Sequence, residues 1–332
     1  MIENDDHELM SRAAWIYYVG GLNQEETANR LGTTRARVNK LLQSAKDAGI
    51  VSISIDSRSN GLLEVEDRLR QRFNLERCIC SPALGLSRTD KLPGNLSEYP
   101  RRAVGSLAAT LVKELIARKG DAVIGTGWGR TLDQITRNMA GVSAPRARFV
   151  SLMGSLTANS AFNPFEVVQA LARATGAEGY FLPVPFIANT PRDRDILLSQ
   201  TTVRSVLEMA RQPDMAIISV GELTEHSLLR RSGMISQLEL DELHEAGAIG
   251  DTNGIFFDAH GAPVRHVLNQ RTLAVNFDAL RATHTVLLSG GIEKAEATCA
   301  LLESGIVKTL VVDGDTAHAV YKIAVNESGA SA

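Results

Sequence analysis

The chain has 332 residues, a hydrophobic content of 44%, a charged content of 22% and a formal net charge of −3. These values are ordinary for globular protein, and the length predicts more than one domain. No apolar run approaches about 18 residues and the N-terminus is polar and acidic, so we expect neither a membrane span nor a signal peptide.

The chain contains three cysteines, Cys78, Cys80 and Cys299. Their odd number and the lack of a metal-type quartet fit a reducing cytosol, so we expect a cytoplasmic protein without a metal site or a cofactor. Cys78 and Cys80 are one residue apart in an apolar stretch, which indicates a buried strand rather than metal ligands.

A first helix is expected near the N-terminus, ending at Gly20 and Gly21. Its apolar face is predicted from residues at the spacing i, i+3, i+4, i+7, namely Trp15, Tyr18, Val19 and Leu22.

The segment from Gln24 to Gln43 has the pattern of a helix-turn-helix. Asn23 and Glu26 can form a capping box at its first helix. Ala28 lies where the two helices must pass closely, and Gly32 supplies a turn residue that tolerates a positive φ. We therefore predict a DNA-binding module.

The second helix of this motif is expected to be capped by Thr33 or Thr34, and its Val38 and Leu41 can pack back onto the first helix. After the motif, alternating apolar and polar residues from Val51 to Asp56 indicate a half-buried strand and hence a winged variant.

Basic residues are concentrated around the motif, although residues 1–56 hold six Lys/Arg against eight Asp/Glu. No acidic residue lies between Arg30 and Lys46. A local basic patch is what phosphate neutralisation requires, whereas its alternative interpretation is a solvated helix face. The expected DNA contacts are Thr33, Thr34, Arg35, Arg37, Asn39 and Lys40.

We predict three regions: a helix-turn-helix domain over 1–56, a linker helix and connecting segment over 57–100, and an α/β domain over 101–332. The linker helix, within Asn60 to Asn74, could be a solvated connection or a dimerising helix. From Arg101 onward, apolar strands alternate with helices, a pattern typical of a parallel sheet covered on both faces.

A glycine-rich loop follows an expected strand over Asp121 to Ile124. Such a loop lets backbone N–H groups approach an anion or hydroxyl, although a purely structural turn is the alternative. The spacing is not the dinucleotide fingerprint. The loop residues expected to bind a ligand are Gly125, Thr126, Gly127, Trp128, Gly129, Arg130 and Thr131.

Two further positions are candidate ligand contacts. Lys294 follows a glycine pair at an expected helix start, where a cation is unfavourable and invites an anionic partner; the alternative is a salt bridge to Glu293 or Asp313. Asp251 precedes an apolar strand, and its carboxylate suits the recognition of hydroxyl groups.

Taken together, these features resemble the SorC-type sugar-responsive bacterial transcription regulators over nearly the whole chain. The matching segments are Trp15 to Asp56, Gly125 to Thr131, Asp251 to Asp258, Ser289 to Ala295 and Asp313 to Ala317. The resemblance implies an effector domain like the sugar-phosphate isomerase and deaminase fold, which binds a sugar, polyol or sugar phosphate without turning it over. It also implies homodimers or homotetramers.

The leading interpretation is therefore a transcription regulator of a carbohydrate or polyol operon, with a repressor favoured over an activator. Its expected partners are operator DNA and a small effector, and we expect no catalytic residues. One alternative is a sugar-phosphate isomerase or deaminase with an added DNA-binding domain, for which Asp251, Asp258 and Glu293 are the candidate acids and bases. A structural nucleoid protein is a third possibility, against which the glycine-rich loop argues.

Overall fold

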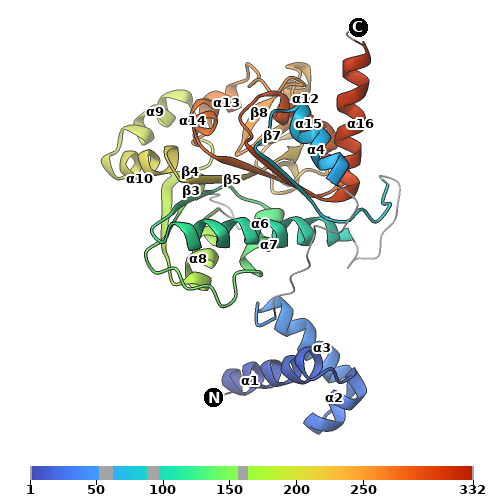
Figure 1. Ribbon diagram of the computed structural model, residues 1–332. Helices are drawn as coiled ribbons and strands as arrows, with labels where there is room; N and C mark the ends of the chain where they lie inside the picture. Colours follow the sequence, from blue (N-terminus) through green and yellow to red (C-terminus); the bar gives the residue numbers. More distant parts are fainter. Residues whose placement is uncertain (1, 52–62, 88–96, 156–163, 331–332) are drawn as a thin grey trace.

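The computed structural model describes residues 2–51, 63–87, 97–155 and 164–330, and a small helical unit lies below a larger α/β domain in Figure 1. The expected strand from Val51 to Asp56 lies outside the described residues from position 52 on, so the wing stays a prediction. The small unit consists of α1 (Ile2–Ala14), the π-helix η1 (Trp15–Val19), α2 (Gln24–Leu31) and α3 (Arg35–Asp47).

The apolar face predicted for the first helix is wrong. Trp15 is 64% exposed and Val19 is 68% exposed, whereas Ala13 and Ala14 are buried against the motif. The physical reason is the π-helical turn, in which Gly20 N–H donates to the Trp15 carbonyl five residues earlier. A π turn holds more residues than an α turn, so it shifts which side chains face inward.

The larger domain is built on a seven-stranded parallel sheet in the order β1-β10-β9-β5-β2-β3-β4. Its strands are β1 (Arg77–Cys80), β2 (Val123–Thr126), β3 (Arg148–Ser155), β4 (Glu178–Pro185), β5 (Met215–Ser219), β9 (Thr285–Ser289) and β10 (Thr309–Val312). The α/β class with a parallel sheet is confirmed.

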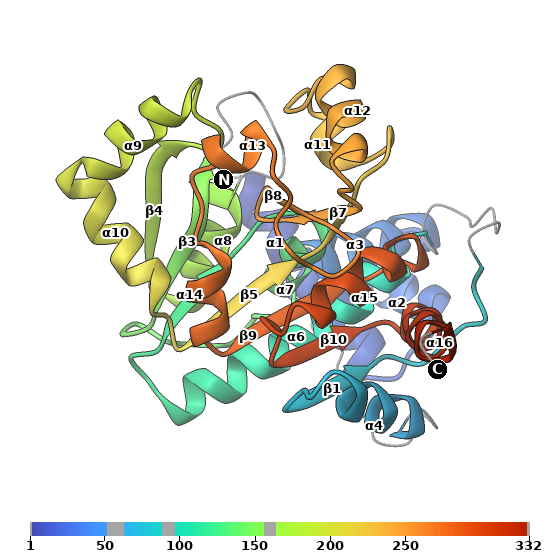
Figure 2. The ribbon, with the colours of Figure 1, turned by 90° about the horizontal axis from the view of Figure 1, so that it is seen from above.

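Helices cover both faces of this sheet, as Figures 1 and 2 show. One face packs on α6 (Tyr99–Arg118), α7 (Arg130–Thr136) and α8 (Pro164–Thr175). The opposite face packs on α4 (Leu63–Arg72), α10 (Thr201–Arg211), α14 (Phe277–Ala282), α15 (Ala295–Glu303) and α16 (Gly314–Ala330). The other helices described for the larger domain are α9 (Pro191–Ser199), α11 (Leu228–Arg231), α12 (Gln237–Glu245), α13 (Val267–Arg271) and the 3₁₀ turn η3 (Ile292–Lys294).

Two edge strands bear on the expected domain organisation. The β1 strand contains Cys78 and Cys80 and pairs in parallel with β10, so the 57–100 segment supplies an edge of the large sheet as well as a connection. The other edge, β4, was not expected from the sequence. It contains Pro183 and Pro185, and proline is tolerated in a sheet mainly at its edges.

A small antiparallel sheet follows β5 along the chain. It consists of β6 (Gly221–Glu222), β7 (Gly250–Thr252) and β8 (Ile255–Phe257). Asn253 and Gly254 join the last two strands with φ values of 50° and 72°. Positive φ at both central residues is what a type I′ hairpin turn requires, and Asn-Gly is its favoured pair.

Replacing Gly105 with alanine should destabilise the larger domain, because α6 lies directly on α7 at this position. A Cβ at Gly105 would lie 2.9 Å from the carbonyl carbon of Gln134 and closer still to its Cβ. We expect a loss of about 1–3 kcal/mol from overpacking, reduced by the better helix propensity of alanine. Urea unfolding measures the change in the free energy of unfolding, and Thr110→Ala, at an exposed position of the same helix, is the control. If Gly105→Ala unfolds with the same free energy as wild type, the close packing of α6 on α7 does not limit stability.

Candidate functional site

The helix-turn-helix is held by local hydrogen bonds. Asn23 accepts from the backbone N–H groups of Glu25 and Glu26 at 3.0 Å, and its own N–H donates to the Glu26 carboxylate at 2.8 Å. Gly32 closes α2 with a φ of 64°, and the Thr34 hydroxyl caps α3 by accepting from Arg37 N–H at 3.2 Å. The predicted capping box and turn are thus present.

Burial divides the second motif helix into two faces. Val38 and Leu41 are buried against Ala28, as expected. The exposed residues of the α3 start and its outer face are Thr34, Arg35, Asn39 and Lys40, whereas Thr33 is half-buried in the turn. This exposed face is free to meet a DNA groove.

Two of the basic residues on α3 have different surroundings. Arg35 reaches Gln24 at 3.4 Å and stays exposed, and Gln24 also donates to Asn39 at 3.4 Å. Arg37 forms an ion pair with Asp6 of α1 at 2.7 Å and is half-buried. Arg37 therefore has an intramolecular partner that it would have to leave or share in order to contact a phosphate.

In the larger domain, a narrow cavity of about 50 Å³ lies at the carboxyl ends of β2, β5 and β9 and beside the small sheet. This is the edge at which open α/β sheets bind ligands. The cavity is lined by Trp128, Gly129, Arg130, Thr131, Ser219, Val220, Gly221, Glu222, Ser227, Leu228, Leu229, Asp251, Asn253 and Lys294.

The structure brings the second half of the predicted loop, Asp251 and Lys294 together around one cavity, but it places the first half elsewhere. Among the described residues, Gly125, Thr126 and Gly127 do not line the cavity. Gly125 lies where a Cβ would be 2.6 Å from Leu152, and Gly127 lies where one would be 2.5 Å from Asn253 Oδ1. These two glycines therefore allow close packing of β2 with its neighbours.

Gly129 is the N-cap residue of α7 and connects the glycine-rich loop to this helix. Its φ is 111°, a conformation that side-chain-bearing residues rarely adopt. The Ser219 hydroxyl at the end of β5 donates to the Trp128 carbonyl at 3.0 Å. Trp128 itself is 6% exposed and packs against Phe186, with ring centroids 6.0 Å apart.

Burial shifts the pKa values of three charged groups of the cavity. Burial raises the pKa of Asp251 to about 6, although its carboxylate accepts from Gly254 N–H at 3.0 Å. Burial lowers the pKa of the Lys294 ammonium and also that of the Arg130 guanidinium. Charged groups whose pKa values are shifted by burial in a cleft mark candidate functional sites.

Several cavity residues were not expected from the sequence. Asn253 is 2% exposed, and its Nδ2 has no hydrogen-bond partner among the described residues; the same holds for the Thr126 hydroxyl beneath the loop. A buried polar group without a partner is uncommon and calls for a function. Asn-Gly signals a hairpin turn in the sequence, but nothing local shows that this turn faces the glycine-rich loop.

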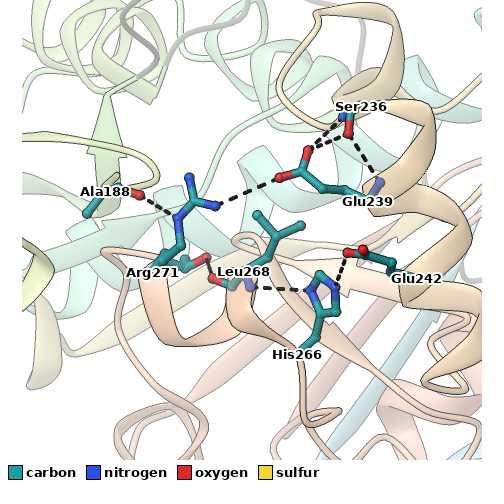
Figure 3. Close-up of polar contacts among 8 residues, drawn as sticks. Ala188, Ser236, Glu239, Glu242, His266, Leu268 and Arg271 are labelled. Carbon is teal, nitrogen blue, oxygen red and sulfur yellow. Dashed lines mark hydrogen bonds and ion pairs between the residues drawn. The ribbon is translucent and has the colours of Figure 1, made fainter. Parts of the chain in front are cut away.

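The outer wall of the cavity comes from α11, which is joined to α12. Figure 3 shows how α12 is fixed. Glu239 accepts from the Ser236 N–H at 2.8 Å and lies 3.8 Å from Arg271, whose Nε donates to the Ala188 carbonyl at 2.7 Å. His266 lies 3.3 Å from the Glu242 carboxylate. These contacts tie the wall to α13 and to the segment after β4.

Comparison with known proteins identifies the family of the chain. Residues 57–322 match the family model described as "Putative sugar-binding domain". The erythritol catabolism regulatory protein EryD of Brucella abortus is 35% identical over 315 residues, which cover 95% of this chain and 96% of the relative. The transcriptional regulator LsrR of Escherichia coli K12 is 32% identical over 321 residues, covering 96% and 95%.

The chain belongs to the SorC-type family of sugar-binding transcriptional regulators. Solved structures share its fold. The full-length sorbitol operon regulator SorC from Klebsiella pneumoniae superposes with a TM-score of 0.68 at 22% identity and covers 96% of this chain and 99% of that chain. A DeoR family regulator from Listeria monocytogenes gives a TM-score of 0.70 at 22% identity, covering 79% and 100%.

The three carboxylates considered for an isomerase have different surroundings in this SorC-type regulator, and Glu222 lines the cavity as a further carboxylate beside Asp251. Of the three candidates, Asp251 lines the cavity and Asp258 accepts from the backbone of a neighbouring loop. Glu293 is 45% exposed and lies 3.5 Å from Arg101. Within the described ranges there is also no group of three His, Cys, Asp or Glu residues able to hold a metal ion, and no helix long and apolar enough to cross a membrane.

Replacing Asp251 with asparagine should remove a pH-dependent contribution to stability. The folded pKa of about 6 lies above the usual value near 3.9, so the native state holds this proton more tightly. Asp251 therefore contributes stability at low pH that is lost as pH rises through 6. The difference in unfolding free energy between wild type and Asp251→Asn should change by about 2 kcal/mol from pH 4 to pH 7. Urea unfolding at several pH values tests this, and a constant difference would rule out the raised pKa.

Proposed function

We propose that this DNA-binding regulator acts in the cytoplasm as a repressor of a carbohydrate or polyol catabolic operon. A sugar, polyol or sugar phosphate bound in the cavity lowers its affinity for the operator. The observation that carries the proposal is the convergence of Arg130, Asp251, Asn253 and Lys294, from three separate segments, on one cavity.

The chemistry of these groups suits a polyhydroxylated ligand. The Asp251 carboxylate can accept hydrogen bonds from hydroxyl groups, and the Asn253 amide brings a donor that has no partner among the described residues. The Lys294 ammonium and the Arg130 guanidinium can donate to hydroxyl or phosphate oxygens, and an anionic ligand would relieve their desolvation. The EryD relative is named for erythritol catabolism, which supports a small polyol as the class to test first.

Binding must also widen the cavity. Its volume of about 50 Å³ holds only a few water molecules, whereas sites for small organic ligands are larger. The wall residues Ser227, Leu228 and Leu229 belong to the start of α11, outside the large sheet. We therefore place the required movement in α11, because displacing it leaves the strands and the glycine-rich loop in place.

The DNA-binding half of the proposal assigns Thr33, Thr34, Arg35, Arg37, Asn39 and Lys40 to the operator interface. Helix-turn-helix proteins bind two half-sites about one helical turn of DNA apart, so we propose a homodimer or homotetramer as the active species.

A thermal-shift screen tests the effector. The panel contains erythritol, sorbitol and ribose, their monophosphates, and inorganic phosphate. A compound present at a hundredfold excess over its Kd should stabilise the protein by about 2.7 kcal/mol. The same compound should release the full chain from a duplex selected out of a random pool. A compound that is chemically converted on prolonged incubation would instead favour the enzyme interpretation, and stabilisation without any change in DNA affinity would overturn the proposed control.

A further inference from the structure

The short helix α7 reaches from the effector cavity to the DNA-binding unit. At one end, Arg130 and Thr131 line the cavity. Just past the other end, Arg137 Nη1 lies 3.1 Å from Asp47 Oδ1, at the last residue of α3. A seven-residue helix is about 10 Å long, so the two contacts are separated by roughly one small helix.

The contact at Arg137 involves more than one ion pair. A Cβ at Gly49, just after α3, would lie 3.6 Å from the Arg137 carbonyl oxygen, so the backbones of the two units also approach here. Asp133 of α7 lies 3.9 Å from Arg137 and is a second carboxylate for the same guanidinium. The side chain of Arg137 can therefore pair across the junction or within its own helix.

The junction around this ion pair is loosely filled. An open cavity of about 350 Å³ lies between the end of α3, the first half of α6 and the end of α7, with Lys46, Asp47, Arg102, Gln134 and Arg137 among its lining residues. This cavity opens to the surface, so the two units are not closely packed along it. The helix-turn-helix unit can thus change its position without breaking a well-packed interface.

The helix α6 holds α7 in place and touches both regions. Gly105 allows the two helices to pack closely, as described above. Arg101 is buried and acts electrostatically on both Arg130 and Lys294, whereas the next residue, Arg102, lines the junction cavity. The pair α6–α7 is therefore a stiff body with one side at the effector cavity and the other at the junction.

We propose that α7 transmits effector binding to the helix-turn-helix, and that the ion pair between Arg137 and Asp47 sets the position of the DNA-binding unit. Effector contact at Arg130 shifts α7, and the Arg137 guanidinium then exchanges its ion pair with Asp47 for one with Asp133 on its own helix. This inference deepens the proposed function, since it names how that cavity is coupled to DNA. An exposed ion pair shifts such an equilibrium modestly, by about two- to fivefold.

The position of the DNA-binding unit can be measured directly in the full chain. Spin labels at Asn29→Cys on α2 and Arg118→Cys on α6, in a Cys78→Ser background, report the distance between the units by pulsed electron paramagnetic resonance. Both label positions are exposed. Arg137→Gln and Asp47→Asn should each raise the population of displaced molecules two- to fivefold, and Arg137→Lys should restore most of the original distribution.

Lys119→Gln is the matched control, because Lys119 pairs with Asp214 at 2.6 Å within the larger domain. It should leave the distance distribution unchanged. If Arg137→Gln also leaves it unchanged, the ion pair does not position the unit and the inference fails.

A variant at the cavity end replaces the unknown effector. Arg130→Ala should displace the DNA-binding unit in the same direction as Arg137→Gln, and the double variant should show no more displacement than Arg137→Gln alone. Additive effects, or no effect of Arg130→Ala, would overturn transmission through α7. Because this test needs no sugar, a failed ligand screen would contradict the proposed function without deciding the role of α7.

Discussion

Lys294→Ala and Asp251→Ala should each weaken effector binding tenfold or more while operator binding stays normal. Both side chains are buried in the cavity wall, and the face of α3 that we propose to contact DNA belongs to a separate unit. Removing one partner of a charge-assisted hydrogen bond costs on the order of 1.5–3 kcal/mol. Within the described residues Lys294 has no ion pair, so the predicted alternative of a salt bridge to Glu293 or Asp313 is not observed.

Titration of wild-type and variant operator complexes with the compound found by the screen measures this effect. Lys119→Ala is a suitable control because it removes a lysine whose pair with Asp214 lies elsewhere in the larger domain. Superimposable dose-response curves for wild type and Lys294→Ala would remove Lys294 from the effector site. A loss of thermal stability with unchanged effector affinity would assign it a structural role.

Arg35→Ala should weaken operator binding by about 1–3 kcal/mol if Arg35 contacts a base. If Arg35 contacts a phosphate, the substitution should weaken binding to all DNA sequences by a similar factor. Arg35 is exposed at the first residue of α3, where side chains of recognition helices reach the groove. Arg37→Ala should also weaken operator binding. Because Arg37 forms an ion pair with Asp6, a substitution of Asp6 can be compared with it.

The comparison is Asp6→Ala, which frees Arg37 without removing it. If Arg37 binds DNA, Asp6→Ala should tighten operator binding while Arg37→Ala weakens it. Fluorescence anisotropy at a fixed salt concentration measures all three variants, because phosphate contacts depend strongly on salt. Operator affinity that is unchanged in both Arg35→Ala and Arg37→Ala would exclude α3 as the recognition helix.

Features fixed by neighbouring residues were predictable from the sequence. The capping box of Asn23 and Glu26 and the left-handed Gly32 depend on contacts within about one turn of helix, and both are present. The burial of Val38 follows from its place in the spacing of the helix-turn-helix motif. The alternation of apolar strands with helices after Arg101 was also predictable from hydrophobic periodicity, although the edge strand β4 was not. Lys294 could be predicted to line a ligand site because a cation is unfavourable near the positive N-terminal end of a helix dipole.

Features that depend on distant segments could not be read in this way. Asn253 lines the cavity because the small sheet lies beside the end of β5, where the Thr252 hydroxyl donates to the Ser219 carbonyl. Ser227 lines it because α11 begins there. The role of Gly127 depends on Asn253, which lies far away in the sequence. The inward face near Trp15 was wrong because a single π turn changes the phase of a helix, and apolar spacing does not signal such a turn.

The two tryptophans of the chain lie one in each functional unit and in opposite environments. Trp15 is 64% exposed on the DNA-binding unit, and Trp128 is 6% exposed beside the effector cavity. Their fluorescence should therefore separate without any labelling. Trp15 should emit at longer wavelength and be quenched by iodide, whereas Trp128 should emit at shorter wavelength and resist quenching. A single unmodified sample can then report DNA binding and effector binding as two optical signals.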